Sequence, residues 1–277
     1  MNYRHAFHAG NFADVHKHLV LLALLERLKR KPTPFFFLDT HAGRGRYDLA
    51  SPDATRSAEW REGVARLASG KLRAEDSQRY VEASGLTQTP LRTYLGSPLL
   101  ALHALRAGDR AVFVEQQTAE AAALEREVQR RRNVSVVCGD GYAALRAYLP
   151  PKENRGLVLI DPPYEADNEF AKVEKALEFC LTRWPNGVVA AWYPIKATRE
   201  AQRLHAALAK SGLRKLLLLE LLVRPPDAPL GLNGSGLVIA NPPWQLDQEI
   251  RVALEELSPL LAQDGAGRVR VEWLVEE

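Results

Sequence analysis

Short apolar runs that alternate with helix-length segments constrain the fold of this chain more than any other feature. Five such runs occur, at residues 35–38, 111–114, 134–138, 157–160 and 188–192. Apolar runs of about four to eight residues in this rhythm are typical of βαβ units. Such units assemble into a parallel sheet with helices on both faces. The sequence therefore predicts an open, mostly parallel α/β sheet.

The last part of the chain departs from this rhythm. The apolar runs 216–223 and 237–240 are separated by proline- and glycine-rich residues instead of a helix-length segment. This spacing predicts a hairpin-like pair that reverses the strand direction. With the five earlier runs, the pair makes a mostly parallel sheet of seven strands. An alternating apolar pattern over residues 269–275 predicts a further strand at the edge.

Two segments before the second apolar run have helical character. Residues 11–30 place apolar side chains at helical spacing behind Asn11, a favourable N-cap, and predict an amphipathic helix. Residues 51–95 lack strand-like alternation and carry helical spacings, so they predict a small helical insertion. Ser97 is expected to cap the next helix. The expected units are the N-terminal segment with the first helix and first turn (1–50), the insertion (51–95) and the remainder of the main domain (96–277).

Composition narrows the class of protein. The chain has 37 Lys and Arg against 34 Asp and Glu, a formal charge of +3, so a nucleic-acid partner is allowed but not required. Cys138 and Cys180 lie far apart, which argues against a disulfide framework or a thiolate zinc site and fits a reducing cytoplasm. The early apolar run 19–25 is well short of the ~18 residues that a membrane helix needs. We therefore expect a cytoplasmic protein without a signal peptide or membrane span.

The residues that follow the apolar runs are suited to binding a ligand, because ligands bind outside the carboxyl ends of the strands in such a sheet. After the first run, Gly43 and Gly45 allow the backbone to approach a ligand closely, with His41 at the rim. Glu115 ends the second run, where an acid accepts hydrogen bonds from a cofactor ribose, and Asp140 repeats the arrangement after the third. Since no third glycine completes a dinucleotide fingerprint, a dehydrogenase is disfavoured.

The strongest chemical signal is Asp161-Pro162-Pro163-Tyr164, directly after the fourth run. Two prolines cannot continue a strand ladder, so they turn the chain out of the sheet into a stiff loop. The Asp161 carboxylate and the Pro162 carbonyl are suited to accept hydrogen bonds from an exocyclic amino group of a base and to aim its lone pair at a sulfonium methyl group. Tyr164 is expected to stack on the base. The loop predicts methylation of an amino group on a nucleobase.

A second segment, Asn241-Pro242-Pro243-Trp244, fits the same general pattern. It follows a later strand-like run, whereas the loop that shares a crevice with the first glycine turn should follow the fourth run. We therefore predict that the Asn241 loop is structural.

Histidines are concentrated at the N-terminus. Four of the seven fall within the first eighteen residues, at positions 5, 8, 16 and 18. They lack both the zincin spacing and a cysteine partner, so no metal site is predicted. Instead, we expect residues 3–18 to fold over the crevice, with Lys17 and His18 at the head of the first helix. The residues expected to contact RNA by stacking and phosphate contacts are Tyr3, Arg4, His5 and His8.

Basic clusters provide a further argument for a polyanionic partner. They lie at residues 27–31, at Arg44 and Arg46, and at residues 130–132. Together they favour a nucleic-acid backbone over a small molecule, although charges at helix ends also serve solubility.

Taken together, these motifs make the chain resemble the RlmJ family, adenine N6 methyltransferases of large-subunit (23S) ribosomal RNA. The resemblance covers nearly the whole chain. It is carried by Tyr3-Arg4-His5-Ala6-Phe7-His8-Ala9-Gly10-Asn11, Ala13-Asp14-Val15, Lys17-His18, Leu38-Asp39-Thr40-His41-Ala42-Gly43, Gly45-Arg46-Tyr47, Gly96-Ser97-Pro98 and Leu159-Ile160-Asp161-Pro162-Pro163-Tyr164-Glu165.

The resemblance implies a Rossmann-like class I methyltransferase fold with a helical insertion, and S-adenosylmethionine as the cofactor. The residues it implies for cofactor binding are His18, His41, Ser97, Glu115, Asp140, Gly141 and Asp161; Lys17, Gly43 and Gly45 are expected beside them. It implies Asp161 as a catalytic residue within the loop of Pro162, Pro163 and Tyr164, and Tyr3 as an RNA contact. The expected partner is large-subunit ribosomal RNA, with no obligate protein partner.

Other functions remain open from the residues alone. An Asp-Pro-Pro-Tyr loop serves any planar amino group, so methylation of DNA adenine or of a protein amide is an alternative. A non-catalytic RNA-binding module is another. Binding of S-adenosylmethionine separates the enzymes from the module.

Overall fold

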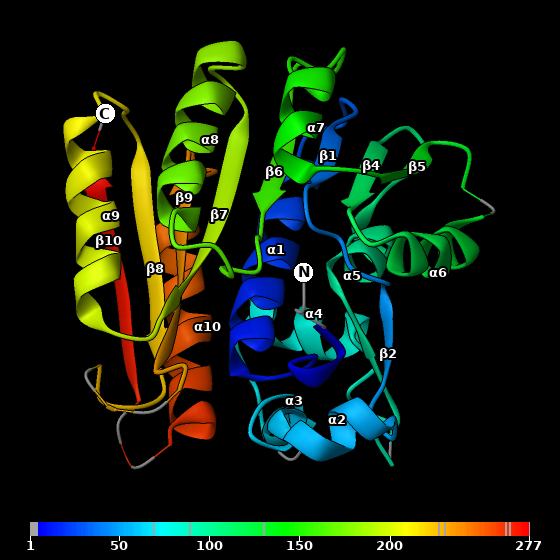
Figure 1. Ribbon diagram of the computed structural model, residues 1–277, viewed down its shortest axis with the longest axis vertical. Coiled ribbons are helices and arrows are strands. Elements are labelled where there is room, and N and C mark those ends of the chain that lie inside the picture. Colours follow the sequence, from blue (N-terminus) through cyan, green and yellow to red (C-terminus); the bar gives the residue numbers. More distant parts are fainter. Residues whose placement is uncertain are drawn as a thin grey trace.

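The computed structural model describes residues 5–68, 70–88, 90–129, 131–226, 228–229, 231–263, 265 and 267–276. Within these residues, eight strands form one sheet. Their bounds are β1 (Phe36–Asp39), β4 (Arg110–Glu115), β5 (Val134–Cys138), β6 (Gly156–Ile160), β7 (Val188–Ile195), β8 (Leu216–Leu222), β9 (Gly234–Ala240) and β10 (Arg268–Val275). The strand order is β10-β8-β9-β7-β6-β1-β4-β5 (Figure 1).

The sheet is mostly parallel, as predicted. β1 pairs in parallel with β4 and β6, β4 with β5, and β6 with β7. β9 lies antiparallel between β7 and β8, and β10 pairs antiparallel with β8. The seven expected strands and the predicted edge strand are therefore present, and the carboxyl ends of β1, β4, β5, β6 and β7 share one edge.

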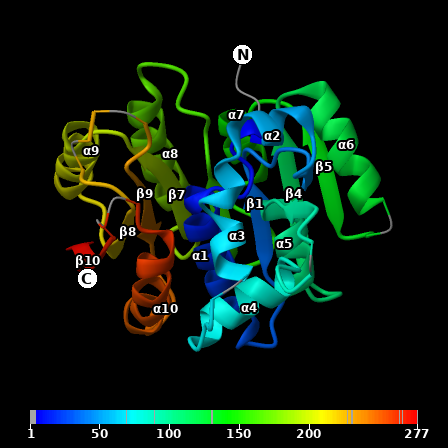
Figure 2. The same ribbon diagram turned by 90° about the horizontal axis from the view of Figure 1, so that it is seen from below.

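Helices cover both faces of the sheet (Figures 1 and 2). One face packs against α1 (Phe12–Lys29), α5 (Ser97–Ala104), α6 (Thr118–Val128) and α10 (Leu246–Leu261), and the other against α7 (Gly141–Tyr148), α8 (Glu169–Arg183) and α9 (Thr198–Lys210). Successive strand residues alternate between two cores, so Phe37 belongs to the first and Phe36 to the second. None of the described helices combines the length and apolarity needed to span a membrane.

The helical insertion contains α2 (Pro52–Ser57), the 3₁₀ turn η2 (Glu59–Arg61), α3 (Val64–Ala68) and α4 (Glu75–Ala83). Its helices α2 and α3 lie beyond the carboxyl ends of the parallel strands (Figure 1). The segment 51–95 also contains a strand, which the sequence analysis missed: β3 (Thr93–Leu95) pairs with β2 (Arg46–Asp48). Three residues are too few for an alternating pattern to be visible. The division into units at 50 and 95 stays a prediction.

The first helix differs from the predicted amphipathic helix. Asn11 caps α1 as expected, its side chain accepting a hydrogen bond from the Asp14 amide. However, α1 is buried around nearly its whole circumference, because α4, α5 and α10 pack against it in addition to the sheet. Polar side chains of α1 therefore have buried partners. Arg27 bonds to Asp76 and Glu249, so this member of the basic cluster 27–31 is not a surface contact for phosphate.

Candidate active site

The predicted site residues meet at one cavity of about 1390 Å³. It lies at the carboxyl ends of β1, β4, β6 and β7 and is bounded by the head of α1 and the insertion residues around η2. The predicted residues that line it are His5, His8, Lys17, His18, His41, Gly43, Ser97, Glu115, Asp161, Pro162, Pro163 and Tyr164. Tyr3 and Arg4 lie outside the described residues. The parallel sheet thus brings together residues from distant parts of the sequence, because its strand ends share an edge.

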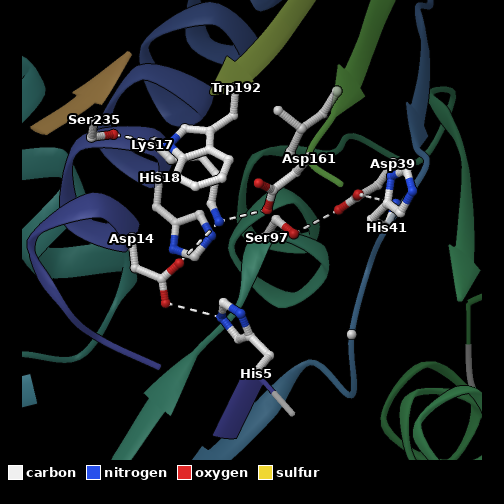
Figure 3. A network of polar contacts seen from close by, with 12 residues as sticks. His5, Asp14, Lys17, His18, Asp39, His41, Ser97, Asp161, Trp192 and Ser235 are labelled. Atoms are coloured by element: carbon white, nitrogen blue, oxygen red, sulfur yellow. Dashed lines mark hydrogen bonds and ion pairs between the residues drawn. The ribbon is translucent and has the colours of Figure 1, made fainter. Parts of the chain in front are cut away.

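Asp161 and Lys17 form the centre of a polar network (Figure 3). The Lys17 ammonium lies 2.5 Å from Asp161 Oδ2 and 2.9 Å from Asp14 Oδ1. His5, in the 3₁₀ turn η1 (His5–Phe7), bonds to Asp14 Oδ2 at 3.1 Å. Burial alone would raise the pKa of Asp14, but the Lys17 ammonium and His5 hold it well below its ordinary value. The first helix therefore presents a fixed positive charge to the Asp161 loop.

Tyr164 is more enclosed than the sequence analysis assumed. Its hydroxyl donates to the Trp192 carbonyl at 2.7 Å, and its ring meets Phe170 and Trp192 edge to face. The backbone at Tyr164 has φ +51°, an uncommon conformation for a residue with a side chain. The tight turn that follows the two prolines is thus held by packing of this ring.

The glycine turn after β1 contacts the acid that ends β4. The Gly43 amide donates to Glu115 Oε2 at 2.9 Å, and the Gln117 amide donates to Glu115 Oε1 at 2.7 Å. Gly43 has φ +64°, and an added Cβ would lie 2.3 Å from the Tyr47 hydroxyl, so only glycine fits here. Burial raises the pKa of Glu115. A carboxylate has about four acceptor positions, so the backbone amides do not use the full acceptor capacity of Glu115.

Two histidines on the cavity wall are neutral. Burial lowers the pKa of His18 to about 3, and its Nδ1 lies 2.5 Å from the Tyr94 hydroxyl. Burial also lowers the pKa of His41, whose Nδ1 bonds to the Thr40 hydroxyl at 2.8 Å. Uncharged imidazoles are hydrogen-bonding groups that do not repel a cationic ligand.

Ser97 does not cap α5 through its side chain, contrary to expectation. Gly96 is the N-cap residue, and the Ser97 hydroxyl donates to Asp39 Oδ2 at 2.6 Å. Asp39, at the end of β1, is fully buried and also accepts from the His41 amide. Burial raises the pKa of Asp39 to about 7, with the Asp161 charge adding to this effect. The Ser97 hydroxyl therefore donates to the buried Asp39 carboxyl and does not cap α5.

Gly45, Asp140 and Gly141 were predicted at the site but do not line the cavity. Asp140 is the N-cap of α7, its side chain accepting from the Ala143 amide at 2.8 Å. An added Cβ at Gly141 would lie 2.1 Å from the Thr40 carbonyl oxygen, so this glycine lets α7 approach the turn after β1. Asp140 and Gly141 therefore have structural roles at the start of α7, and their part in cofactor binding stays a prediction.

The N-terminal histidines have separate partners. His8 bonds to Glu59 of η2 at 3.0 Å, and this hydrogen bond raises the pKa of His8. His16 lies within α1 and bonds to Ser235 of β9 at 2.9 Å. In the described part of the chain, no group of three or more His, Cys, Asp or Glu side chains is arranged to hold a metal ion.

The second proline motif, Asn241-Pro242-Pro243-Trp244, lies at the amino ends of the parallel strands, opposite the cavity. β9 runs antiparallel to β7, so Ala240 pairs with Val189 near the start of β7. Asn241 follows there and donates to the carbonyls of Pro185 and Gly187 at 2.7 and 2.9 Å. The topology thus separates Asn241 from the cavity and gives its side chain a structural partner.

The second basic cluster, Arg44 and Arg46, forms ion pairs with acids of α6. Arg44 pairs with Glu120, and Arg46 pairs with Glu127. Arg130, the first residue of the third cluster, lies outside the described residues. The acids that pair with Arg44 and Arg46 lie 76 and 81 residues further along the chain, so no local sequence pattern indicates these ion pairs.

Trp192 and Lys196 line the cavity although neither was predicted as a site residue. Trp192 was taken as the last residue of a fifth strand, but β7 continues to Ile195 and Trp192 lines the cavity. Lys196 follows β7 and is exposed at the rim. Alternation over residues 188–195 places Trp192 on the face of the sheet that packs against α1. Pro194 argues against a strand that continues beyond Trp192, so the sequence predicted a strand that ends too early.

Comparison with known proteins identifies relatives over the whole chain. The family model described as "Ribosomal RNA large subunit methyltransferase D, RlmJ" matches residues 32–275. Ribosomal RNA large subunit methyltransferase J of Haemophilus influenzae is 42% identical over 280 residues, and that of Escherichia coli is 38% identical over 283 residues. Both matches cover 100% of this chain and 100% of the relative.

A solved structure supports the same assignment. A crystal structure of a Legionella pneumophila protein is similar with a TM-score of 0.87 and 32% sequence identity, and the match covers 96% of this chain and 98% of that chain. The fold is the α/β fold of class I methyltransferases, with a mixed and mostly parallel sheet, as predicted. The resemblance found in the sequence is confirmed. The chain belongs to the RlmJ family of large-subunit ribosomal RNA methyltransferases.

Proposed function

We propose that this chain uses S-adenosylmethionine to methylate N6 of one adenine in large-subunit (23S) ribosomal RNA. One observation carries the proposal: the Asp161-Pro162 loop stands directly beside the glycine turn of β1, above one cavity. β1 and β6 are parallel neighbours, with Asp39 paired to Leu159, so the segments after them leave the sheet side by side. An acceptor for an amino group and a turn for a cofactor therefore share one wall.

The cavity suits the cofactor. Its volume of about 1390 Å³ exceeds the roughly 300–1,000 Å³ of ordinary ligand pockets, which leaves room for a cofactor and a nucleotide together. Glu115 offers acceptor positions for ribose hydroxyls, and Ser97, His18 and His41 offer neutral polar groups. Glu115 and Asp161 line the cavity as acids and offer oxygen acceptors to the cofactor and the base. When bound, S-adenosylmethionine supplies an electrophilic methyl group.

Asp161 has two tasks in the proposed reaction. The adenine amino group is a poor nucleophile, because its lone pair is delocalised into the ring. Hydrogen bonds from that group to Asp161 and to the Pro162 carbonyl draw the nitrogen toward tetrahedral geometry. The amino nitrogen would become cationic on receiving the methyl group and would then have to release one proton, which the Asp161 carboxylate is suited to accept. Lys17 holds this carboxylate in position from the side of α1.

Two observations support RNA as the substrate: the names of the relatives and the residues at the rim of the cavity. The curated relatives carry the name ribosomal RNA large subunit methyltransferase J. At the rim, His5, His8 and Lys196 lie within one cavity wall, where they are suited to contact a nucleotide and its phosphates. Tyr3 and Arg4 precede them in the chain. A base must leave its stack to reach Asp161, and adenines that are already unpaired do so most readily.

The test is incubation of the protein with labelled S-adenosylmethionine and unmodified, protein-free large-subunit RNA, followed by digestion and mass spectrometry of the nucleosides. N6-methyladenosine made by the unsubstituted protein and not by Asp161→Ala is the expected result. Label in DNA or protein instead of RNA would favour the alternative amino methyltransferases. Calorimetry provides the last distinction, since a non-catalytic RNA-binding module would bind RNA without binding the cofactor.

A further inference from the structure

Trp192 is an aromatic surface at the cavity that the proposed reaction does not yet use. Along β7, the residues on either side of Trp192 are buried, and Trp192 itself is partly exposed and lines the cavity. Its ring centroid lies 5.6 Å from the Lys17 ammonium, which also holds Asp161. A partly exposed aromatic ring on the wall of a polar cavity is typical of a ligand contact.

The orientation of this ring is held by the buried Ser235 side chain (Figure 3), which in turn bonds to the buried His16. The indole Nε1 donates to the Ser235 hydroxyl at 2.9 Å, and the same hydroxyl lies 2.9 Å from His16 Nδ1. Ser235 and His16 are fully buried, on β9 and α1 respectively. Burial lowers the pKa of His16 to about 3, so its imidazole is neutral. The hydroxyl can therefore accept from the indole and donate to His16, which joins three elements through one oxygen.

Tyr164 supports the ring from another side. The two ring centroids lie 5.6 Å apart with an interplanar angle of 76°, and the Tyr164 hydroxyl donates to the Trp192 carbonyl. Two aromatic planes thus stand nearly at right angles beside the Asp161 loop. A planar base that stacks on one of them meets the other edge to face, which is a favourable arrangement for aromatic rings.

We propose that Trp192 is a contact residue for the target adenine, and that Ser235 and His16 are positioning residues that fix its indole ring beside Asp161. This inference rests on the proposed function and names the wall of the pocket that receives the base. Trp192 provides a stacking surface or an edge contact, while Asp161 and Pro162 receive the amino group.

The first test compares Trp192→Leu with Trp192→Phe in the RNA methylation assay. Loss of a stacked aromatic ring typically weakens binding of a base by about ten- to hundredfold, so we expect Trp192→Leu to raise KM for RNA by that order. Trp192→Phe keeps an aromatic face and should stay within about threefold of the unsubstituted protein. Trp244→Leu is the matched control, because Trp244 is 82% exposed and does not line the cavity. Calorimetry should give unchanged affinity for S-adenosylmethionine in all three variants.

The second test asks whether Ser235 acts through the indole. Ser235→Ala should lower kcat/KM in the unsubstituted background but change little further in Trp192→Phe, which has no indole N–H to orient. His16→Leu should follow the same pattern. A merely structural role would give equal losses in both backgrounds, so the double-mutant cycle separates the two explanations.

Each outcome is decisive. If Trp192→Leu methylates RNA with unchanged kinetic constants while Asp161→Ala is inactive, the inference is wrong and the proposed function stands. Equal losses from Ser235→Ala in the two backgrounds would overturn the positioning role. If the unsubstituted protein makes no N6-methyladenosine, the proposed function and this inference fail together.

Discussion

The ammonium of Lys17 lies 2.5 Å from Asp161 Oδ2, although 144 residues separate the two positions in the chain. Asp14 binds the same ammonium from one turn earlier on α1. The three side chains are largely buried, so the lysine is the cation that allows two carboxylates to lie close together. The first helix of the chain and the fourth parallel strand end thus form one unit.

Replacing this lysine should impair methyl transfer. In Lys17→Met, Asp161 loses its ion-pair partner and Asp14 keeps only His5 and the Gly10 amide, so the Asp161 carboxylate no longer has a fixed orientation. We expect the misplaced carboxylate to raise the activation free energy by about 1–3 kcal/mol, which corresponds to a rate loss of about five- to hundredfold. Single-turnover rates would measure the loss. Lys210→Met, at the exposed end of α9, serves as the control, and a Lys17→Met rate equal to that of the control would contradict the prediction.

The second proline motif should affect stability and not the reaction. Asn241→Ala removes two hydrogen bonds to the carbonyls of Pro185 and Gly187, each worth roughly 1 kcal/mol. We expect the free energy of unfolding to fall by about 1–2 kcal/mol and methyl transfer at low temperature to stay largely intact. Denaturant titration and the nucleoside assay check the two parts. A rate loss comparable to that of Asp161→Ala would show that the Asn241 loop takes part in the chemistry.

The Arg27 ion pairs should matter more for stability than any surface pair of the same helix. The Arg27 side chain is 2% exposed and bonds to Asp76, which is 5% exposed, and to Glu249. Breaking a buried pair by removing one partner costs about 3–5 kcal/mol, so Arg27→Met should destabilise the fold by that order. Arg30→Met is the matched control, since Arg30 also pairs with Glu249 but is 51% exposed; its effect should be below about 1 kcal/mol. Similar losses in both variants would refute the role of burial.

Asp39 should make stability depend on pH in an unusual direction. Its pKa rises from an ordinary value of 3.8 to about 7 because the carboxyl is buried, with the Asp161 charge adding to the effect. The folded state therefore holds this proton more tightly than the unfolded state. Its contribution to stability is complete below about pH 4 and is lost as the pH rises through about 7.

Asp39→Asn isolates this effect, because the other titrating groups remain. At about 1.4 kcal/mol per pKa unit, the unsubstituted protein should lose on the order of 4 kcal/mol relative to Asp39→Asn between about pH 4 and pH 8. Urea unfolding of both proteins across this range measures the difference. Parallel stability curves would show that Asp39 titrates normally.

Much of the fold was accessible from local patterns. Apolar runs such as 157–160 are short and bounded by turn residues, so their strand character does not depend on distant contacts. The glycine turn after β1 is likewise local: Gly43 is required by its own backbone conformation. The predictions that were wrong concern contacts between residues that are far apart in the sequence. The prediction that α1 is amphipathic was wrong because α4, α5 and α10 also pack against this helix. The prediction that Ser97 caps α5 was wrong because its hydroxyl donates to Asp39.

By itself, the sequence determined which residues stand at the strand ends, because a strand and the turn that follows it are set by a few adjacent residues. Parallel pairing then gathers Gly43, Glu115 and Asp161 at one edge without further information. Only the tertiary structure decided which side chains meet across that edge. Lys17 reaches Asp161 because α1 packs against β6, and Trp192 is held by Ser235 because β9 pairs antiparallel with β7. Such contacts depend on register and helix packing, which no short segment encodes.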